Sequence, residues 1–140
     1  TKVLSNESKG LPDSDWFDVT GLYTGNPNPE YRSNLFVDWS KGDWSVSWTT
    51  RTMSNVYENC FTWCNDQGEG DGRNNTGFYA VHDINVRWKA PWDAVVSVGK
   101  RNAFDKEPPV LTNNTFAHSF DAAYDIPGGG YWYMQYRQDF

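Results

Sequence analysis

Five segments of alternating apolar and polar residues, separated by turn-forming clusters, constrain the fold of this chain more than any other feature. Successive side chains of a β-strand point to opposite faces, so the alternation predicts strands with one apolar and one polar face. Clusters of Gly, Pro, Asn and Asp mark turns, and nothing reads as a helix of useful length. The expected strands cover residues 31–39, 44–52, 78–88, 92–101 and 131–140. The sequence therefore predicts an all-β protein with about five antiparallel strands.

The connections between these strands alternate in length. Short turns lie at 40–43 and 89–91, polar loops span 54–76 and 104–129, and residues 1–30 are expected to be mostly loop. A tilted strand of about 9 to 11 residues is long enough to cross a bilayer. Short periplasmic turns and long outer loops are typical of outer-membrane barrels. The pattern thus favours the last part of a transmembrane β-barrel.

Aromatic residues fall near the ends of the expected strands. If both short turns are periplasmic, Trp39, Trp44, Trp88 and Trp92 lie at one height and face the same way, since they flank these turns. Amphipathic rings prefer the headgroup level, so aromatic girdles mark both interfaces of a lipid-exposed barrel. The expected girdle residues are Trp39, Trp44, Trp88, Trp92 and Phe140 on one side, and Tyr31, Phe78 and Trp132 on the other.

The two faces of the strands predict what each of them contacts. The expected lipid-facing residues include Val37, Val46, Ile84, Val96 and Met134. The expected interior residues include Arg32, Arg51, Arg87 and Arg137. A soluble sandwich or jelly roll is the alternative, because its strands alternate as well and paired tryptophans can close its hairpins.

Composition excludes several classes of protein. A chain of 140 residues fits one domain, and eight Trp, eight Tyr and eight Phe argue against disorder. The net charge of -6 makes nucleic acid an unsuitable partner. No apolar run approaches the roughly 18 residues of a membrane-spanning helix.

Two motifs in the second half of the chain resemble the end of TonB-dependent outer-membrane receptors. Residues 98–109, VGKRNAFDKEPP, look like the family's penultimate-strand signature, and residues 124–128, YDIPG, look like the element before its closing strand. The chain also ends in an aromatic strand and Phe140, as outer-membrane proteins do. Lys100 departs from the pattern, since an apolar residue is usual there. A lysine near the outer interface can extend its ammonium group into water.

The resemblance implies a barrel of about 22 strands with an N-terminal plug, of which this chain would be the C-terminal portion over residues 1–140. It further implies uptake of a siderophore, haem, cobalamin or oligosaccharide across the bacterial outer membrane. The implied partners are outer-membrane lipid, the rest of the barrel and plug, the transported ligand and an energy-transducing periplasmic protein. The alternative is a soluble all-β carbohydrate-binding module with a tryptophan-rich face.

The chemistry-bearing residues indicate no active site, so we expect a transport protein that is not an enzyme and has no cofactor or metal. Cys60 and Cys64 alone make an incomplete zinc site, and in an exported loop a disulfide is the better expectation. Trp63, at the tip of that loop, is the candidate ligand contact. His82 and His118 have no recognisable nucleophile partner.

Overall fold

The computed structural model describes residues 1–9, 12–13, 15–59, 73–111, 121–124 and 129–138. It divides into two compact units. The first contains residues 1–33, 52–79 and 108–126, and the second contains residues 34–51, 80–107 and 127–140. Within the part of the chain that the structure describes, all regular elements are β-strands and no helix could span a membrane.

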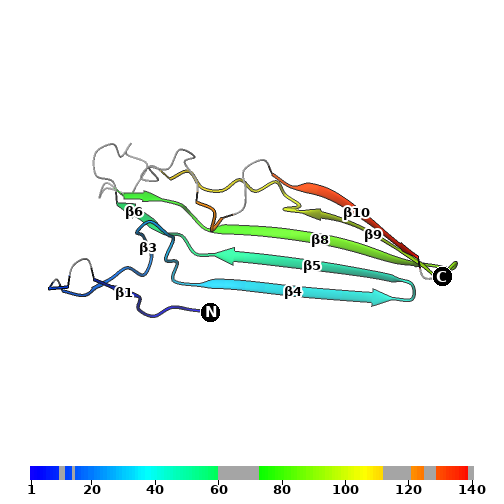
Figure 1. Cartoon of the computed structure of the whole chain (residues 1–140), viewed down its shortest axis with the longest axis horizontal. Coiled ribbons are helices and arrows are strands. Elements are labelled where there is room, and N and C mark those ends of the chain that lie inside the picture. The colour runs from blue at the N-terminus through cyan, green and yellow to red at the C-terminus, as the bar shows by residue number, and fades with distance from the viewer. Residues whose placement is uncertain (10–11, 14, 60–72, 112–120, 125–128, 139–140) are drawn as a thin grey trace. The chain divides into compact units, whose positions relative to one another are not determined.

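A five-stranded antiparallel sheet is the main element of the chain. Its spatial order is β10-β9-β8-β5-β4, as Figure 1 shows. The strands are β4 (Arg32–Lys41), β5 (Trp44–Met53), β8 (Tyr79–Ala90), β9 (Ala94–Arg101) and β10 (Tyr131–Gln138). These correspond to the five strands expected from the alternation, so the predicted all-β antiparallel fold is confirmed.

The two hairpin turns differ in detail from the sequence prediction. β4 continues through Lys41, and Gly42 and Asp43 alone form the turn. Gly42 has a φ of 58°, which the first position of a type II′ turn requires and glycine adopts without strain. The predicted start of the fourth strand at Trp92 is wrong, because residues 91–93 form the turn. Asp93, with a φ of 56°, closes this three-residue loop.

The pairing register of the strands fixes the faces of β8, β9 and β10. Met134 pairs with Val98, which pairs with Val86 on its other side, and Tyr136, Val96 and Trp88 form the next such row. Because the side-chain period of a strand is two, these rows share one face. The other face has the rows Gln135, Ser97 and Arg87, and Arg137, Val95 and Lys89.

The first unit consists of short strands around a small core. Its strands are β1 (Glu7–Ser8), β2 (Phe17–Asp18), β3 (Leu22–Tyr23), β6 (Tyr57–Asn59) and β7 (Arg73–Asn75). β6 pairs in parallel with β3 and antiparallel with β7. The core is formed by Tyr23, Val56 and Leu111. The prediction of an uninterrupted loop over 54–76 is therefore wrong, since β6 and β7 lie in it.

Polar contacts stabilise the first unit where its apolar core is small. Glu58 is fully buried and accepts a hydrogen bond of 3.0 Å from the Asn74 amide. The Tyr23 hydroxyl donates to Asp121 at 2.8 Å. Burial, followed by this hydrogen bond, raises the pKa of Tyr23 above its ordinary value.

Candidate functional site

One face of the five-stranded sheet is apolar along its whole width. The register places Ile84, Val86 and Trp88 of β8 on this face with Val96 and Val98 of β9. On β5 the even-numbered residues belong to it, because Trp44 stacks on Trp88 and Trp48 contacts His82. The two-residue turn Gly42–Asp43 pairs Lys41 with Trp44. Paired residues share a face, so the odd-numbered residues of β4 also belong to this face. We call this surface the apolar face.

Many large side chains of the apolar face are exposed. Trp132 and Met134 on β10 have exposed fractions of 72% and 71%. The others that are exposed are Leu35, Val37, Trp39, Trp44, Trp48, Trp92, Val98 and Tyr136. Soluble monomers rarely expose a continuous apolar patch of more than a few hundred Å². A surface of this kind is therefore expected to contact lipid or another molecule.

An aromatic row crosses the apolar face at the end that carries the two hairpin turns. The rings of Trp44 and Trp88 stack with centroids 5.9 Å apart, and Trp92 contacts Trp88 edge-on at 5.5 Å. The Trp92 indole N–H then donates to the Tyr136 hydroxyl at 3.4 Å. The expected girdle residues Trp44, Trp88 and Trp92 are thus brought together. Trp39 lies on the neighbouring strand β4, and Phe140 lies outside the described residues.

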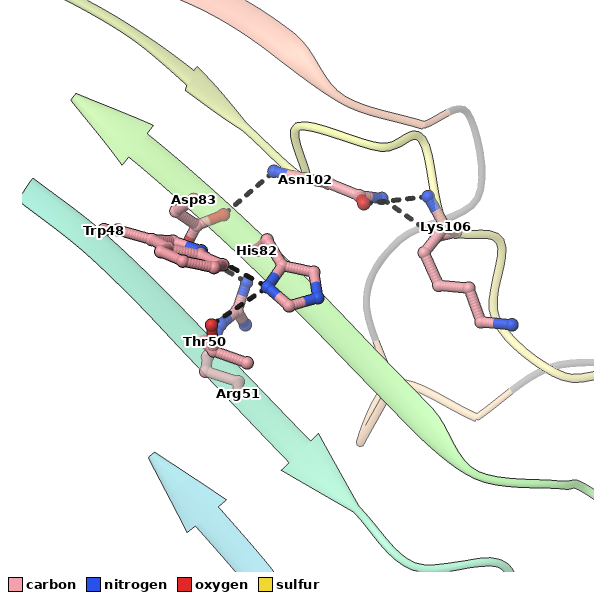
Figure 2. A network of polar contacts seen from close by, with 7 residues as sticks. All are labelled: Trp48, Thr50, Arg51, His82, Asp83, Asn102 and Lys106. Atoms are coloured by element: carbon pink, nitrogen blue, oxygen red, sulfur yellow. Dashed lines mark hydrogen bonds and ion pairs between the residues drawn. The ribbon is translucent and has the colours of Figure 1, made fainter. Parts of the chain in front are cut away.

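A second aromatic cluster lies toward the opposite end of the apolar face. Trp48 and Phe104 contact the His82 ring at centroid distances of 5.7 and 5.2 Å. The Trp48 indole N–H can only donate, so the His82 Nδ1 atom, 3.3 Å away, accepts its hydrogen bond. The Thr50 hydroxyl lies 2.9 Å from the same nitrogen (Figure 2). At this end of the apolar face, hydrogen-bonding groups and aromatic rings lie in the same cluster, as they do at a membrane interface.

The remaining girdle residues lie in different parts of the chain. Trp132 is the second residue of β10 and pairs with Lys100, whose ammonium group is 6.0 Å from the indole centroid. Tyr31 and Phe78 belong to the first unit, where their rings are 6.4 Å apart. Their assignment to an outer girdle stays a prediction.

The segment after β9 forms a tightly hydrogen-bonded turn. Asn102 is buried and has a φ of 45°, a left-handed conformation that asparagine tolerates better than most residues. Its backbone N–H donates to the Asp83 carboxylate at 2.8 Å (Figure 2). Its side-chain amide bonds both the N–H and the carbonyl of Lys106, each at 2.8 Å. The R-N-x-F-D-K motif is therefore a structural turn in this chain.

Asp105 joins this turn to the start of β10. One carboxylate oxygen accepts the Gly130 N–H at 2.8 Å, and the other lies 2.9 Å from the Lys100 ammonium group. The same ammonium group donates to the Ala103 carbonyl at 3.0 Å. Lys100 thus directs its charge to polar groups of the turn after β9, in the manner expected for a lysine near an interface.

Replacing Asn102 by alanine should loosen this turn. The variant loses both hydrogen bonds to the Lys106 backbone, and alanine is less suited than asparagine to the positive φ. We expect a loss of about 2 to 4 kcal/mol in the free energy of unfolding, measured in detergent by urea titration. Asn34→Ala, at an exposed position of β4, is the control. An equally small effect of both changes would contradict the structural role of Asn102.

The same turn should respond to acid. The hydrogen bond from Lys100, followed by that from the Gly130 N–H, holds the pKa of Asp105 below its ordinary value. A carboxyl group with a lowered folded-state pKa contributes stability above its unfolded pKa, and this contribution is lost as the pH falls through the lowered value. The Gly130 amide resonance should therefore shift only below the ordinary aspartate range, and Asp105→Asn should abolish that shift. A shift near pH 6 in both proteins would contradict the assignment.

The predicted disulfide and ligand-contact tip lie outside the described residues. This concerns Cys60, Trp63 and Cys64, whose roles stay predictions. The disulfide is tested on the loop peptide of freshly prepared native protein. Its unreduced mass should be lower by two hydrogen atoms than its mass after reduction. Two free thiols in that peptide would contradict the pairing.

Sequence reasoning missed the interactions that position this end of the sheet. Asp83 and Asn102 are 19 residues apart, and only the pairing of β8 with β9 brings them together. No group of three or more His, Cys, Asp or Glu side chains among the described residues could bind a metal ion.

The fold and this surface define a class of protein: an all-β chain whose main sheet is antiparallel and exposes an apolar, aromatic face. No protein-family model matches the chain, and no curated protein or solved structure matches it. The function is therefore argued from the geometry of the sheet and from the motifs at 98–109 and 124–128.

Proposed function

We propose that this chain is the closing part of an outer-membrane β-barrel of the TonB-dependent receptor type. Its function would be passage of a nutrient such as a siderophore, haem, cobalamin or oligosaccharide across the bacterial outer membrane. It would act as a transporter and not as an enzyme. The observation that carries the proposal is the exposed apolar face, bounded at the turn end by the aromatic row.

The dimensions of the sheet support this proposal. β4 and β5 each have ten residues, and β8 has twelve. Ten residues of strand extend about 33 Å, which at a tilt of about 40° spans about 25 Å. That is the height of the apolar band of an outer-membrane barrel. The sheet is therefore long enough to cross the hydrocarbon layer.

The two edge strands of the sheet indicate that further strands pair with it. β10 and β4 are the outermost strands in the described residues. Unpaired backbone groups cost several kcal/mol each in hydrocarbon, so both edges must pair with further strands if the sheet lies in a membrane. The rest of a barrel, with its plug inside, would supply these strands. The periplasmic energy-transducing protein would contact that missing part.

Cell fractionation tests the proposed location. The protein, expressed from its own gene with an affinity tag in a Gram-negative host, should sediment with the outer membrane in a sucrose gradient. Purified protein should be monodisperse in detergent and should aggregate when the detergent is removed. Recovery in the soluble fraction, with a single species in plain buffer, would contradict the proposal.

The second candidate is a soluble carbohydrate-binding module, favoured by the same exposed tryptophans. In that case oligosaccharides should quench or enhance tryptophan fluorescence in detergent-free buffer, and Trp44→Ala should weaken the binding. The two candidates thus differ in one measurable property, the need for detergent.

A further inference from the structure

The His82 ring meets two hydrogen-bonding side chains of β5 at a single atom, its Nδ1 nitrogen. The indole N–H of Trp48 lies 3.3 Å from this atom, and the hydroxyl group of Thr50 lies 2.9 Å from it (Figure 2). Among the described residues, the Trp48 indole N–H has no other acceptor. An indole N–H can only donate, so Nδ1 supplies the lone pair and the proton of the neutral ring is on Nε2.

Protonation of His82 reverses the role of its Nδ1 atom. In the charged ring both nitrogens carry a proton, and neither can accept a hydrogen bond. The Trp48 N–H and the new Nδ1–H would then point at each other, so the indole loses its acceptor. The Thr50 oxygen has lone pairs and can accept the Nδ1–H instead. One proton therefore exchanges the hydrogen bond from Trp48 for a hydrogen bond to Thr50.

The charged groups around His82 are not histidines, and histidine is the side chain whose ordinary charge change falls between pH 5 and 8. On the apolar face, β5 carries no titratable group and β8 carries none besides His82. The charged neighbours are Arg51 and Asp83, paired on the opposite face, and Lys100, Asp105, Lys106 and Glu107 from β9 and the turn after it. The Lys106 ammonium group points away from the ring (Figure 2). A charge change in this range at this cluster is therefore assigned to His82.

We propose that His82 is a pH-sensitive switch of the Trp48 indole. In the neutral state the indole N–H is bound to Nδ1, and in the acid state it is released while the ring keeps Thr50 and gains a positive charge. Trp48 is 45% exposed, so its released N–H can donate to water or to a headgroup oxygen. The switch uses contacts between β5 and β8 alone. Its failure would therefore leave the proposed lipid contact of the apolar face untouched.

Nuclear magnetic resonance of the full chain between pH 8 and pH 5 tests this proposal, in detergent if the protein requires it. We expect the indole N–H resonance of Trp48 and the Cε1–H resonance of the His82 ring to titrate with the same midpoint. The chain has two histidines, so His118→Gln identifies the His82 resonance and should leave its titration unchanged. Trp48→Phe identifies the indole resonance.

Two variants should move the His82 midpoint in opposite directions. Trp48→Phe removes the donor that stabilises the neutral ring, so His82 should titrate at higher pH. Thr50→Val removes the acceptor that stabilises the charged ring, so His82 should titrate at lower pH. We expect each shift to be about 0.5 to 1 pH unit, as the loss of one hydrogen bond predicts. Valine and phenylalanine both favour strands, so these variants should fold.

Three results would overturn the proposal. The first is a Trp48 indole resonance that stays constant while His82 titrates, because protonation would then not release the indole. The second is the absence of any His82 titration in this range. The third is a shift of the same sign in Trp48→Phe and Thr50→Val, which would indicate a general change of environment and not an exchange of partners. The first two results come from the unaltered chain, so they decide the question even if a variant does not fold.

Discussion

Ile84→Arg should destabilise the membrane-inserted protein by on the order of 2 to 4 kcal/mol. Ile84 lies near the middle of the twelve-residue strand β8, four residues before Trp88 in the aromatic row. At about 3.3 Å per residue and a tilt of about 40°, it is about 10 Å deeper than that row. A guanidinium group at this depth has no water and no partner. The effect is measured by urea unfolding of protein reconstituted into phospholipid vesicles.

The neighbouring residue supplies the control. Asn85 faces the other side of the sheet, where its amide donates to the Tyr133 hydroxyl at 3.1 Å. Asn85→Arg loses this one hydrogen bond but stays on the polar face, so we expect a change of about 1 kcal/mol. Equal tolerance of arginine at both positions would mean that the apolar face does not contact lipid, or that the register is shifted by one residue.

Gly130→Ala should destabilise the fold by about 3 kcal/mol. A Cβ atom at Gly130 would lie closer to the carbonyl oxygens of Asn102 and Arg101 than any normal contact allows. These are backbone atoms of the turn after β9, so the chain itself must move. That movement also disturbs the hydrogen bond from the Gly130 N–H to Asp105. The change is measured by urea unfolding in detergent.

Gly99→Ala is the informative comparison. A Cβ atom at Gly99 would contact the Tyr133 ring instead of backbone. Tyr133 is exposed on the edge strand β10, so its ring can rotate away at the loss of its contact with Asn85. We therefore expect about 1 kcal/mol for Gly99→Ala. A larger effect at Gly99 than at Gly130 would contradict the backbone contact as the cause.

The main sheet could be predicted because its strands alternate strictly and carry Val, Ile, Trp and Tyr, which favour strands. The alternation of Ala94 and Val96 continues back to Trp92 and therefore predicts that Trp92 belongs to the fourth strand. This prediction is wrong because Asp93 has a left-handed conformation, which interrupts the strand and makes residues 91–93 a turn. Trp92 nevertheless contacts Trp88. It therefore belongs to the aromatic row although it lies in the turn and not in a strand.

The short strands could not be predicted. β6 and β7 consist of Tyr57–Asn59 and Arg73–Asn75, three residues each and mostly polar. Such segments have little intrinsic preference for strands, and β6 forms because it pairs with β3 and buries Glu58. The hollow that Arg87 and Arg137 line together was equally inaccessible, because it depends on the register of three strands. The interior position of Arg87 and Arg137 was predicted, but their proximity was not.

Site-specific spin labels test the contact of the apolar face with lipid most directly. Met134 and Gln135 are adjacent, both exposed, and face opposite sides of β10. Each is replaced by cysteine in a Cys60→Ser, Cys64→Ser background, and the protein, produced from its own gene, is reconstituted into vesicles. The label at 134 should be accessible to oxygen and shielded from a water-soluble nickel complex, and the label at 135 should not show this lipid pattern. Equal access of the nickel complex to both labels, or the lipid pattern at 135 alone, would contradict a lipid-facing apolar face.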